Sequence, residues 1–137
     1  MHSLPLSAEV YFDGAARGNP GPAGVGIILR LDGRVEKVKR FLGRKTNNQA
    51  EYLALITALE ILASIGCRTV KAYTDSQLLH NQLTGRYRVR DAELRRLHSR
   101  VLELLKDFEK FEIVYVGRGA NREADRLANQ AIDESTA

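Results

Sequence analysis

The stretch VYFDGAARGNPG, residues 10–21, decides how the rest of the chain is interpreted. Apolar residues at positions 8, 10 and 12 alternate with Glu9, Tyr11 and Asp13, which is typical of a β-strand. We expect this strand to end near Asp13, because the glycines and prolines that follow favour turns. A carboxylate at the end of an apolar strand is costly to bury unless N–H groups, a cation or a metal compensate its charge. Capping of the turn would explain Asp13 alone, but three more carboxylates occupy comparable positions.

The length of 137 residues predicts a single domain, residues 1–137, with residues 1–7 and 133–137 frayed. Cys67 is the single cysteine, so an internal disulfide and a C-x-x-C site are excluded, and a reducing, cytoplasmic location is expected. The first residues lack the pattern of a signal peptide, and polar residues interrupt the most apolar stretch, residues 50–65. We therefore expect no membrane association and, by default, a monomer.

The charge distribution favours a polyanionic partner. The net charge is +4 and the sequence pI is about 9.4. Between Thr84 and Arg100 only two acidic residues accompany six arginines. These are Arg86, Arg88, Arg90, Arg95, Arg96 and Arg100.

The hydrophobic pattern predicts an α/β protein with the element order βββαβααβα. The first three strands form an antiparallel meander, and the later strands, joined through helices, run parallel. We expect a mixed five-stranded sheet flanked by helices. The expected strands are 8–13, 24–31, 34–42, 70–74 and 111–116, and the expected helices are 47–65, 77–83, 94–108 and one that follows an Asn121 N-cap. Residues 43–45, 84–90 and 117–120 are expected to be loops or connections.

Four carboxylates are expected to meet at one edge of this sheet. Asp13 and Asp75 follow strands that should be neighbours, Glu51 lies early in the central helix, and Asp125 lies early in the last helix. Sites in open α/β sheets gather at the carboxyl ends of strands. Taken singly, each acid has a simpler explanation: Asp75 as a helix cap, and Glu51 and Asp125 as charges favoured by a helix dipole. Converging acids repel one another unless cations bridge them, and oxygen ligands suit magnesium or manganese.

At these four places the chain resembles a known family, the type 1 ribonucleases H. The matching pieces are DGAARGNPGPAG at Asp13, TNNQAEYLAL at Glu51, YTDSQ at Asp75 and NREADRLAN at Asp125. A single piece would be weak evidence, but four in the same order are specific. The resemblance spans residues 8–132 and is greatest to the short forms of the family, including archaeal and some bacterial members. It implies a ribonuclease H-like fold and hydrolysis of the RNA strand of RNA–DNA hybrids.

The resemblance also implies catalytic roles for the carboxylates. Asp13 would bridge two ions, Mg²⁺ or Mn²⁺, in one active site. Glu51 and Asp75 would complete the coordination of the ion beside the leaving 3′ oxygen. Asp125 would help to hold the ion that activates the attacking water. The implied products carry 5′-phosphate and 3′-hydroxyl ends.

The resemblance assigns further residues to nucleic-acid binding. Asn19 and Gln77 match positions at the minor groove beside the RNA strand, where the glycine-rich turn that begins at Gly14 approaches the 2′-hydroxyl. Another set matches a pocket for a DNA-strand phosphate and a contact to base edges; it consists of Thr46 and Asn48 for the phosphate and Asn47 for the bases. Recognition would then depend on shape and backbone, with little sequence preference.

The chain departs from the family pattern in two places. The loop before Asp125 is GRGAN and holds no histidine; Arg118 is its nearest polar candidate for contact with the scissile phosphate, and a solvent-exposed loop arginine is an equally good interpretation. Residues 84–90 leave no room for the long basic insertion of some bacterial members. That insertion helps to bind the hybrid, and the arginines from Arg86 onward would make part of this contact instead. For Arg95, Arg96 and Arg100 a solvated helix face is the better explanation.

The sequence thus predicts a metal-dependent endoribonuclease. Two alternatives remain: another nuclease of the same superfamily with a different nucleic-acid substrate, and a non-catalytic nucleic-acid-binding domain. The intact set of four acids disfavours the second. The sequence leaves open the preferred ion, activity on double-stranded RNA and the role of Arg118.

Overall fold

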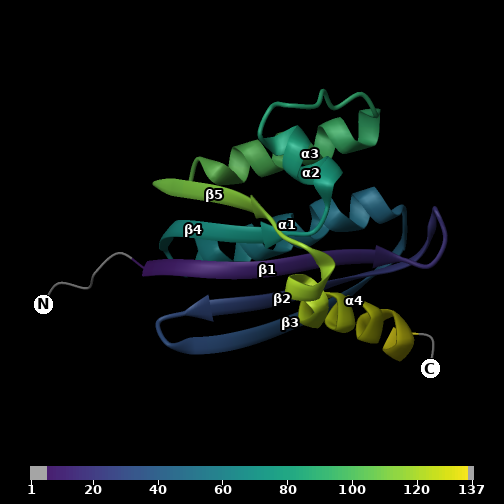
Figure 1. The fold of residues 1–137 in the computed structure, drawn as a ribbon, viewed down its shortest axis with the longest axis horizontal. Helices are drawn as coiled ribbons and strands as arrows, with labels where there is room; N and C mark the ends of the chain where they lie inside the picture. Colours follow the sequence, from purple (N-terminus) through teal and green to yellow (C-terminus); the bar gives the residue numbers. More distant parts are fainter. Residues whose placement is uncertain (1–5, 136–137) are drawn as a thin grey trace, which may run out of the picture.

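The computed structural model describes residues 6–135, and these form one mixed sheet flanked by helices (Figure 1). The predicted order βββαβααβα is confirmed, with one short 3-10 helix (η1) added before the last helix. The strands are β1 (Leu6–Ala16), β2 (Gly21–Leu31), β3 (Arg34–Lys45), β4 (Cys67–Thr74) and β5 (Lys110–Tyr115). The helices are α1 (Asn47–Ser64), α2 (Gln77–Leu83), α3 (Ala92–Leu105), η1 (Arg118–Asn121) and α4 (Arg122–Ser135).

The sheet has the strand order β3-β2-β1-β4-β5. The β1–β2 and β2–β3 pairs are antiparallel, and the β1–β4 and β4–β5 pairs are parallel, as predicted. A tight turn at Asp32, with φ of 55°, and Gly33 joins β2 to β3. Strand β1 is therefore central: it pairs with β2 on one side and with β4, the strand that follows the first helix, on the other.

The first three strands are longer than predicted. Strand β1 continues past Asp13 to Ala16, because residues 13–16 pair with residues 23–26 of β2. The glycines at positions 21 and 24 lie in β2 and do not form turns. Residues 43–45 belong to β3 and are not a loop; the irregular register opposite Ala23 and Gly24 and a positive φ at Gly43 absorb the expected break.

Other boundaries also differ from the prediction. Strand β4 begins at Cys67 rather than residue 70, and α3 ends at Leu105, so Phe108 packs on the core from beyond the helix. Residues 118–121 form η1, not an irregular loop. Residues 6–7 lie in β1 and 133–135 lie in α4, so these predicted frayed positions are ordered; residues 1–5 and 136–137 lie outside the described part of the chain.

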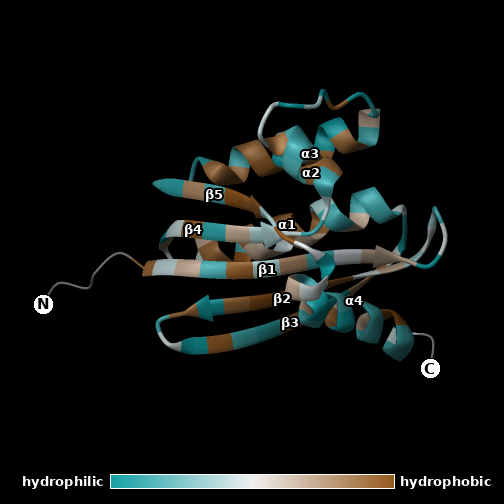
Figure 2. Cartoon of the chain, viewed as in Figure 1, coloured by the Kyte–Doolittle hydropathy of each residue, from teal (hydrophilic) through white to brown (hydrophobic). Residues whose placement is uncertain are grey.

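Helices cover both faces of the sheet. Side chains of Val10 and Phe12 pack on α1 within the main core, whereas Tyr11, one residue out of phase, packs beside Ile28 under α4. Helix α3 covers the outer side of α1, which explains why α1 is apolar on most of its faces. Figure 2 shows the contrast with α4, whose colours are mostly hydrophilic. None of the helices among residues 6–135 is both long and apolar enough to cross a bilayer.

Two glycines allow these helices to approach the sheet. A Cβ at Gly14 would lie 2.1 Å from the carbonyl carbon of Ala50 in α1, and a Cβ at Gly26 would lie 2.0 Å from the carbonyl oxygen of Ala124 in α4. Residues Asp13 and Gly26 are paired across β1 and β2. The two close approaches therefore bring α1 and α4 against the sheet from opposite faces at the level of Asp13.

Candidate active site

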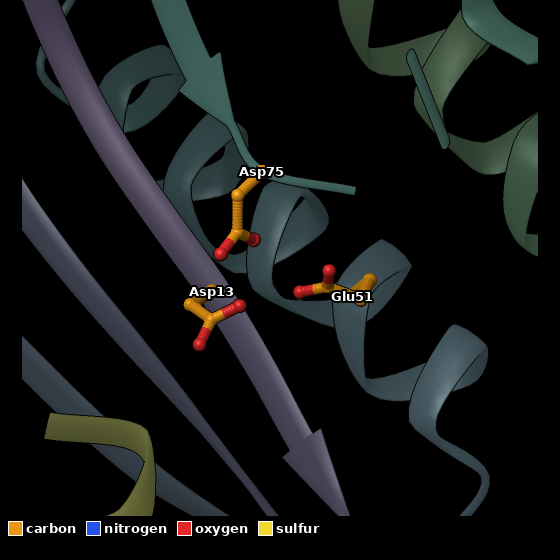
Figure 3. A group of neighbouring side chains, drawn as sticks. All are labelled: Asp13, Glu51 and Asp75. Carbon is orange, nitrogen blue, oxygen red and sulfur yellow. The ribbon is translucent and has the colours of Figure 1, made fainter. Parts of the chain in front are cut away.

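Three carboxylates from three different elements converge. Asp13 comes from β1, Glu51 from α1 and Asp75 from the residue after β4, and the side chains of Glu51 and Asp75 are turned toward Asp13 (Figure 3). Each offers an oxygen within 4.8 Å of the others. This spacing between oxygen donors can hold a metal ion.

The end of the parallel β1–β4 pairing places Asp13 beside Asp75. The last paired residues are Tyr11 and Tyr73, and each carboxylate lies two residues further along its strand. Because strand side chains alternate, residues two positions apart share a face, so both carboxylates follow the stacked rings of Tyr11 and Tyr73 on the same side of the sheet. Asp13 thus lies at the end of the parallel pairing, although β1 itself continues.

Glu51 is fixed by the start of α1 and by the backbone of β1. Thr46 caps the helix through a capping box with Gln49. Glu51 lies beyond the first turn, is 5% exposed, and its Oε1 accepts a 2.6 Å hydrogen bond from the backbone N–H of Gly14. Attraction to the helix dipole therefore does not explain Glu51.

Asp75 is not a helix cap either. The N-cap of α2 is Ser76, whose Oγ accepts from the backbone N–H of Leu79 at 3.1 Å. The Thr74 carbonyl accepts from the N–H of Val116, which ties the end of β4 to the segment after β5. The carboxylate of Asp75 is left facing Asp13.

Asp125 joins the other three acids at the wall of one cavity. It is an exposed residue in the first turn of α4, and with Asp13, Glu51 and Asp75 it lines a cavity of about 550 Å³. It lies outside the tight group of three but close enough to Asp13 to raise the pKa of that residue. The four predicted carboxylates are therefore brought together by four separate elements.

Burial and mutual repulsion make the two innermost acids hard to ionise. Burial raises the pKa of Asp13 strongly, and the neighbouring Glu51, Asp125 and Asp75 add to the effect. Burial also raises the pKa of Glu51, against the opposing hydrogen bonds from Asp13 and from Gly14 N–H. In the absence of a cation the pair holds a proton, which a divalent ion would displace.

These raised pKa values predict that the metal-free protein loses stability as the pH rises. The folded state keeps protons on Asp13 and Glu51 that the unfolded chain releases above its ordinary carboxyl pKa of about 4. Since the folded state binds more protons, its free energy of unfolding falls between about pH 5 and pH 9. Urea unfolding in EDTA at pH 5.5 and pH 8.5 measures this fall. Equal or greater stability at pH 8.5 would contradict the shared proton.

The predicted nucleic-acid contacts divide into two groups. Gly14, Asn47 and Gln77 line the cavity itself. The others lie outside its lining: Asn19 accepts a hydrogen bond from the backbone N–H of Asn47 at 3.1 Å, and Thr46 is engaged in its cap. Asn48 is exposed in the first turn of α1, next to these residues. The β1–β2 turn and the start of α1 therefore form one continuous surface beside the carboxylates.

Arginines stand at the rim of the cavity. Arg118 of η1 lines it, as its prediction as a contact to phosphate requires, and so does Arg122 at the start of α4, which the sequence did not single out. Both are exposed. Within residues 6–135, neither forms an ion pair with the four acids.

Asn121 has a role that the sequence did not predict. It was expected to cap the last helix, but it ends η1, and its side-chain Nδ2 donates 2.8 Å to the backbone carbonyl of Phe12. Asn121 is 1% exposed, and its Oδ1 has no hydrogen-bond partner among the described residues. Its position in front of a helix is a capping signal, and only the tertiary contact reveals the different use.

Comparison with known proteins identifies the family. The family model described as "Reverse transcriptase-like" matches residues 11–131. The ribonuclease HI of Halobacterium salinarum is 49% identical over 129 residues, which are 93% of this chain and 65% of that protein. The chain spans 36% of the length of each of three mycobacterial relatives.

Two solved structures are similar to this chain in both sequence and fold. The crystal structure of RNase H1 from Halobacterium salinarum has a TM-score of 0.89 and 48% identity, covering 93% of this chain and 98% of that chain. LC11-RNase H1, solved in complex with an RNA/DNA hybrid, has a TM-score of 0.89 and 34% identity, covering 95% and 99%. The order of the elements, the fold and these sequence identities together show that the chain belongs to the type 1 ribonuclease H family.

Proposed function

We propose that this chain is a metal-dependent endoribonuclease that hydrolyses the RNA strand of RNA–DNA hybrids. The observation that carries the proposal is the single cavity lined by Asp13, Glu51, Asp75 and Asp125 in a member of this family. A relative of the same fold has been solved with an RNA/DNA hybrid, which supports the same substrate here. We further propose a monomeric, single-domain enzyme that works in the cytoplasm, where it would remove primers and stray hybrids from DNA.

The donor set fits magnesium or manganese. All four side chains offer carboxylate oxygens, and burial with repulsion raises the pKa of Asp13 in a way that a bound cation would reverse. We propose that Asp13 contributes to two ions, Glu51 and Asp75 to one of them and Asp125 to the other. Such ions lower the pKa of bound water and stabilise the charge that develops around phosphorus.

The chain's own groups would position the substrate around this centre. The exposed Arg118 at the rim can approach a phosphate, since a guanidinium presents paired N–H donors to phosphate oxygens. Gln77 and Asn47 line the same cavity and can reach a nucleic-acid strand laid across it. The start of α1, where Asn48 is exposed and Thr46 is half-buried, presents a positive dipole end to a second phosphate.

Arginines in the connection between α2 and α3 would extend the surface that contacts the nucleic acid. Arg96 pairs with Glu93 and Arg100 pairs with Glu60, whereas within the described residues Arg86, Arg88 and Arg90 form no ion pair. The three are exposed and follow α2, which starts at the cavity with Gln77 and spans about 10 Å.

We predict that replacing Arg86, Arg88 and Arg90 together by alanine weakens hybrid binding uniformly across sequences. If all three contact phosphates, the slope of log K against log salt falls by about 2–3. Binding of a non-cleaved hybrid in EDTA, measured at several salt concentrations, tests this. Arg96→Ala is the matched control, because Arg96 is already paired with Glu93. An unchanged slope in the triple variant would show that these arginines are only solvated.

The substrate itself is tested with one labelled RNA strand. The strand is paired in turn with DNA, with RNA or with nothing, and each form is incubated with Mg²⁺, Mn²⁺ or EDTA. The proposal predicts cutting of the hybrid with either ion and none with EDTA. Cutting of duplex RNA as well would keep the chemistry and widen the substrate. Intact RNA in every hybrid reaction, with binding retained, would contradict the proposal and favour a non-catalytic binding domain.

A further inference from the structure

The junction between η1 and α4 is fastened to β1 by one side chain. Asn121 Nδ2 donates to the carbonyl oxygen of Phe12 at 2.8 Å, and both residues are buried. Pairing of β1 with β4 has ended one residue earlier, at Tyr11 and Tyr73. The amide therefore supplies a directional contact to β1 where its parallel neighbour no longer pairs with it.

This contact lies directly between two of the four carboxylates. On the β1 side, Phe12 immediately precedes Asp13. On the other side, Asn121 immediately precedes α4, and Asp125 follows it by four residues, about one helical turn. The next residue of β1, Gly14, donates to Glu51 at 2.6 Å. Two residues of β1, one on each side of Asp13, thus hold the strand to the end of η1 and to α1.

The other contacts of α4 with the sheet at this end are an exposed ion pair and apolar packing. The ion pair joins Lys37 of β3 to Glu123 through two exposed side chains. The body of the helix packs through Ala124 and Leu127 on Ile28. Such apolar contacts hold a helix against a sheet but allow it to slide or rotate slightly, whereas a buried hydrogen bond fixes one atom relative to another. Asn121 thus provides the buried hydrogen bond that ties the start of α4 directly to β1 beside Asp13.

The cost of this arrangement argues against a purely stabilising role. Asn121 Oδ1 is buried with no hydrogen-bond partner within residues 6–135. A buried acceptor without a partner is destabilising. The amide is therefore only half satisfied, and the atom that it does satisfy belongs to the residue before Asp13.

We infer that Asn121 is a positioning residue that holds Asp125 in register with Asp13 and so sets the affinity of the carboxylate cluster for divalent ions. The inference rests on the proposed function for its metal. Asn121 itself need not touch an ion, because it acts through the backbone of Phe12 and the start of α4. Groups behind metal ligands commonly change metal affinity by about 10–100-fold when they are removed.

The test compares Asn121→Leu with the wild type by calorimetric titration with Mn²⁺ in the absence of nucleic acid. We expect an affinity for Mn²⁺ that is weaker by about tenfold. In the cleavage assay, the Mn²⁺ concentration at half activity should rise by a similar factor. The kcat at saturating Mn²⁺ and the KM for the hybrid should stay within about twofold of the wild type, since the four acids remain.

Tyr52→Phe is the matched control. It removes another buried side-chain hydrogen bond, 2.6 Å from Tyr52 Oη to Gln82 Oε1, on the residue next to Glu51 but away from the cavity. We expect it to lower the urea midpoint without changing the Mn²⁺ affinity. Asn121→Ser provides a second variant if the leucine does not fit, because it leaves polar space and also loses the contact with Phe12.

The outcomes separate the inference from the proposed function. A folded Asn121→Leu or Asn121→Ser protein with wild-type Mn²⁺ affinity would overturn the role of Asn121. A loss of stability equal to that of Tyr52→Phe, with no change in metal affinity, would do the same. Absence of hybrid cleavage by the wild type would instead overturn the proposed function, and the calorimetric result would still stand.

Discussion

Asp13→Asn is expected to abolish hybrid cleavage and, in EDTA at pH 8, to make the protein more stable. Asp13 is central to the cluster, and its replacement removes a ligand proposed for both ions. The loss of several kcal/mol of transition-state stabilisation corresponds to about 10³-fold or more in kcat. The neutral amide also removes the cost of keeping a proton on the Asp13–Glu51 pair at pH 8, so the free energy of unfolding should rise by about 1–3 kcal/mol. Single-turnover cleavage and urea unfolding measure the two effects.

The opposite signs of these effects make the prediction specific. A variant that had merely lost its fold would lose both activity and stability. The stability gain should disappear when Mg²⁺ is added, because the ion stabilises the wild type more than the variant. Asp133→Asn serves as the control, since Asp133 is an exposed acid that pairs with Arg17 away from the cavity. Cleavage retained by Asp13→Asn would contradict the metal assignment.

Gly14→Ala is expected to damage both the fold and the site. The added Cβ would lie 2.1–2.4 Å from backbone atoms of Ala50 and Glu51, none of which can move without moving α1. Overpacking against rigid backbone costs about 3 kcal/mol or more. Separation of α1 from β1 would also break the hydrogen bond from Gly14 N–H to Glu51. We expect a lower urea midpoint and, in the protein that remains folded, a drop in kcat of at least about tenfold.

Gly117→Ala is the matched control for this effect. A Cβ at Gly117 meets no atom within 4 Å, and its φ of −72° suits alanine. Wild-type stability and activity are expected for that variant. If Gly14→Ala were as stable and active as Gly117→Ala, the close contact of β1 with α1 would not be what fixes Glu51.

The sequence predicted which side chains form the site more accurately than how the strands and helices position them. The four carboxylates, the order of the elements and the directions of the strands follow from local pattern and motif order. Asp13 was expected at the end of its strand, but β1 continues to Ala16. Gly18 lies in the predicted turn, whereas Gly14 and Gly24 permit tight helix packing, which depends on residues far away in the sequence.

The roles of Asn121 and Arg122 could not be predicted for the same reason. An asparagine before a helix is ordinarily a cap, and its contact with Phe12 joins residues 109 positions apart. Arg122 looks like an ordinary charge on an amphipathic helix until the fold brings it to the cavity. The local pattern fixes which elements form, whereas these contacts arise only when η1 and α4 meet β1.

The most direct test of the account is an analysis of the product ends from one labelled hybrid, incubated with the wild-type protein in Mg²⁺ or in EDTA. If the carboxylates hold ions that activate water, cleavage occurs only with the ion and leaves 5′-phosphate and 3′-hydroxyl ends. Cleavage that persists in EDTA and leaves a 2′,3′-cyclic phosphate would show that the RNA's own 2′-hydroxyl is the nucleophile. That result would contradict the proposed role of Asp13, Glu51, Asp75 and Asp125.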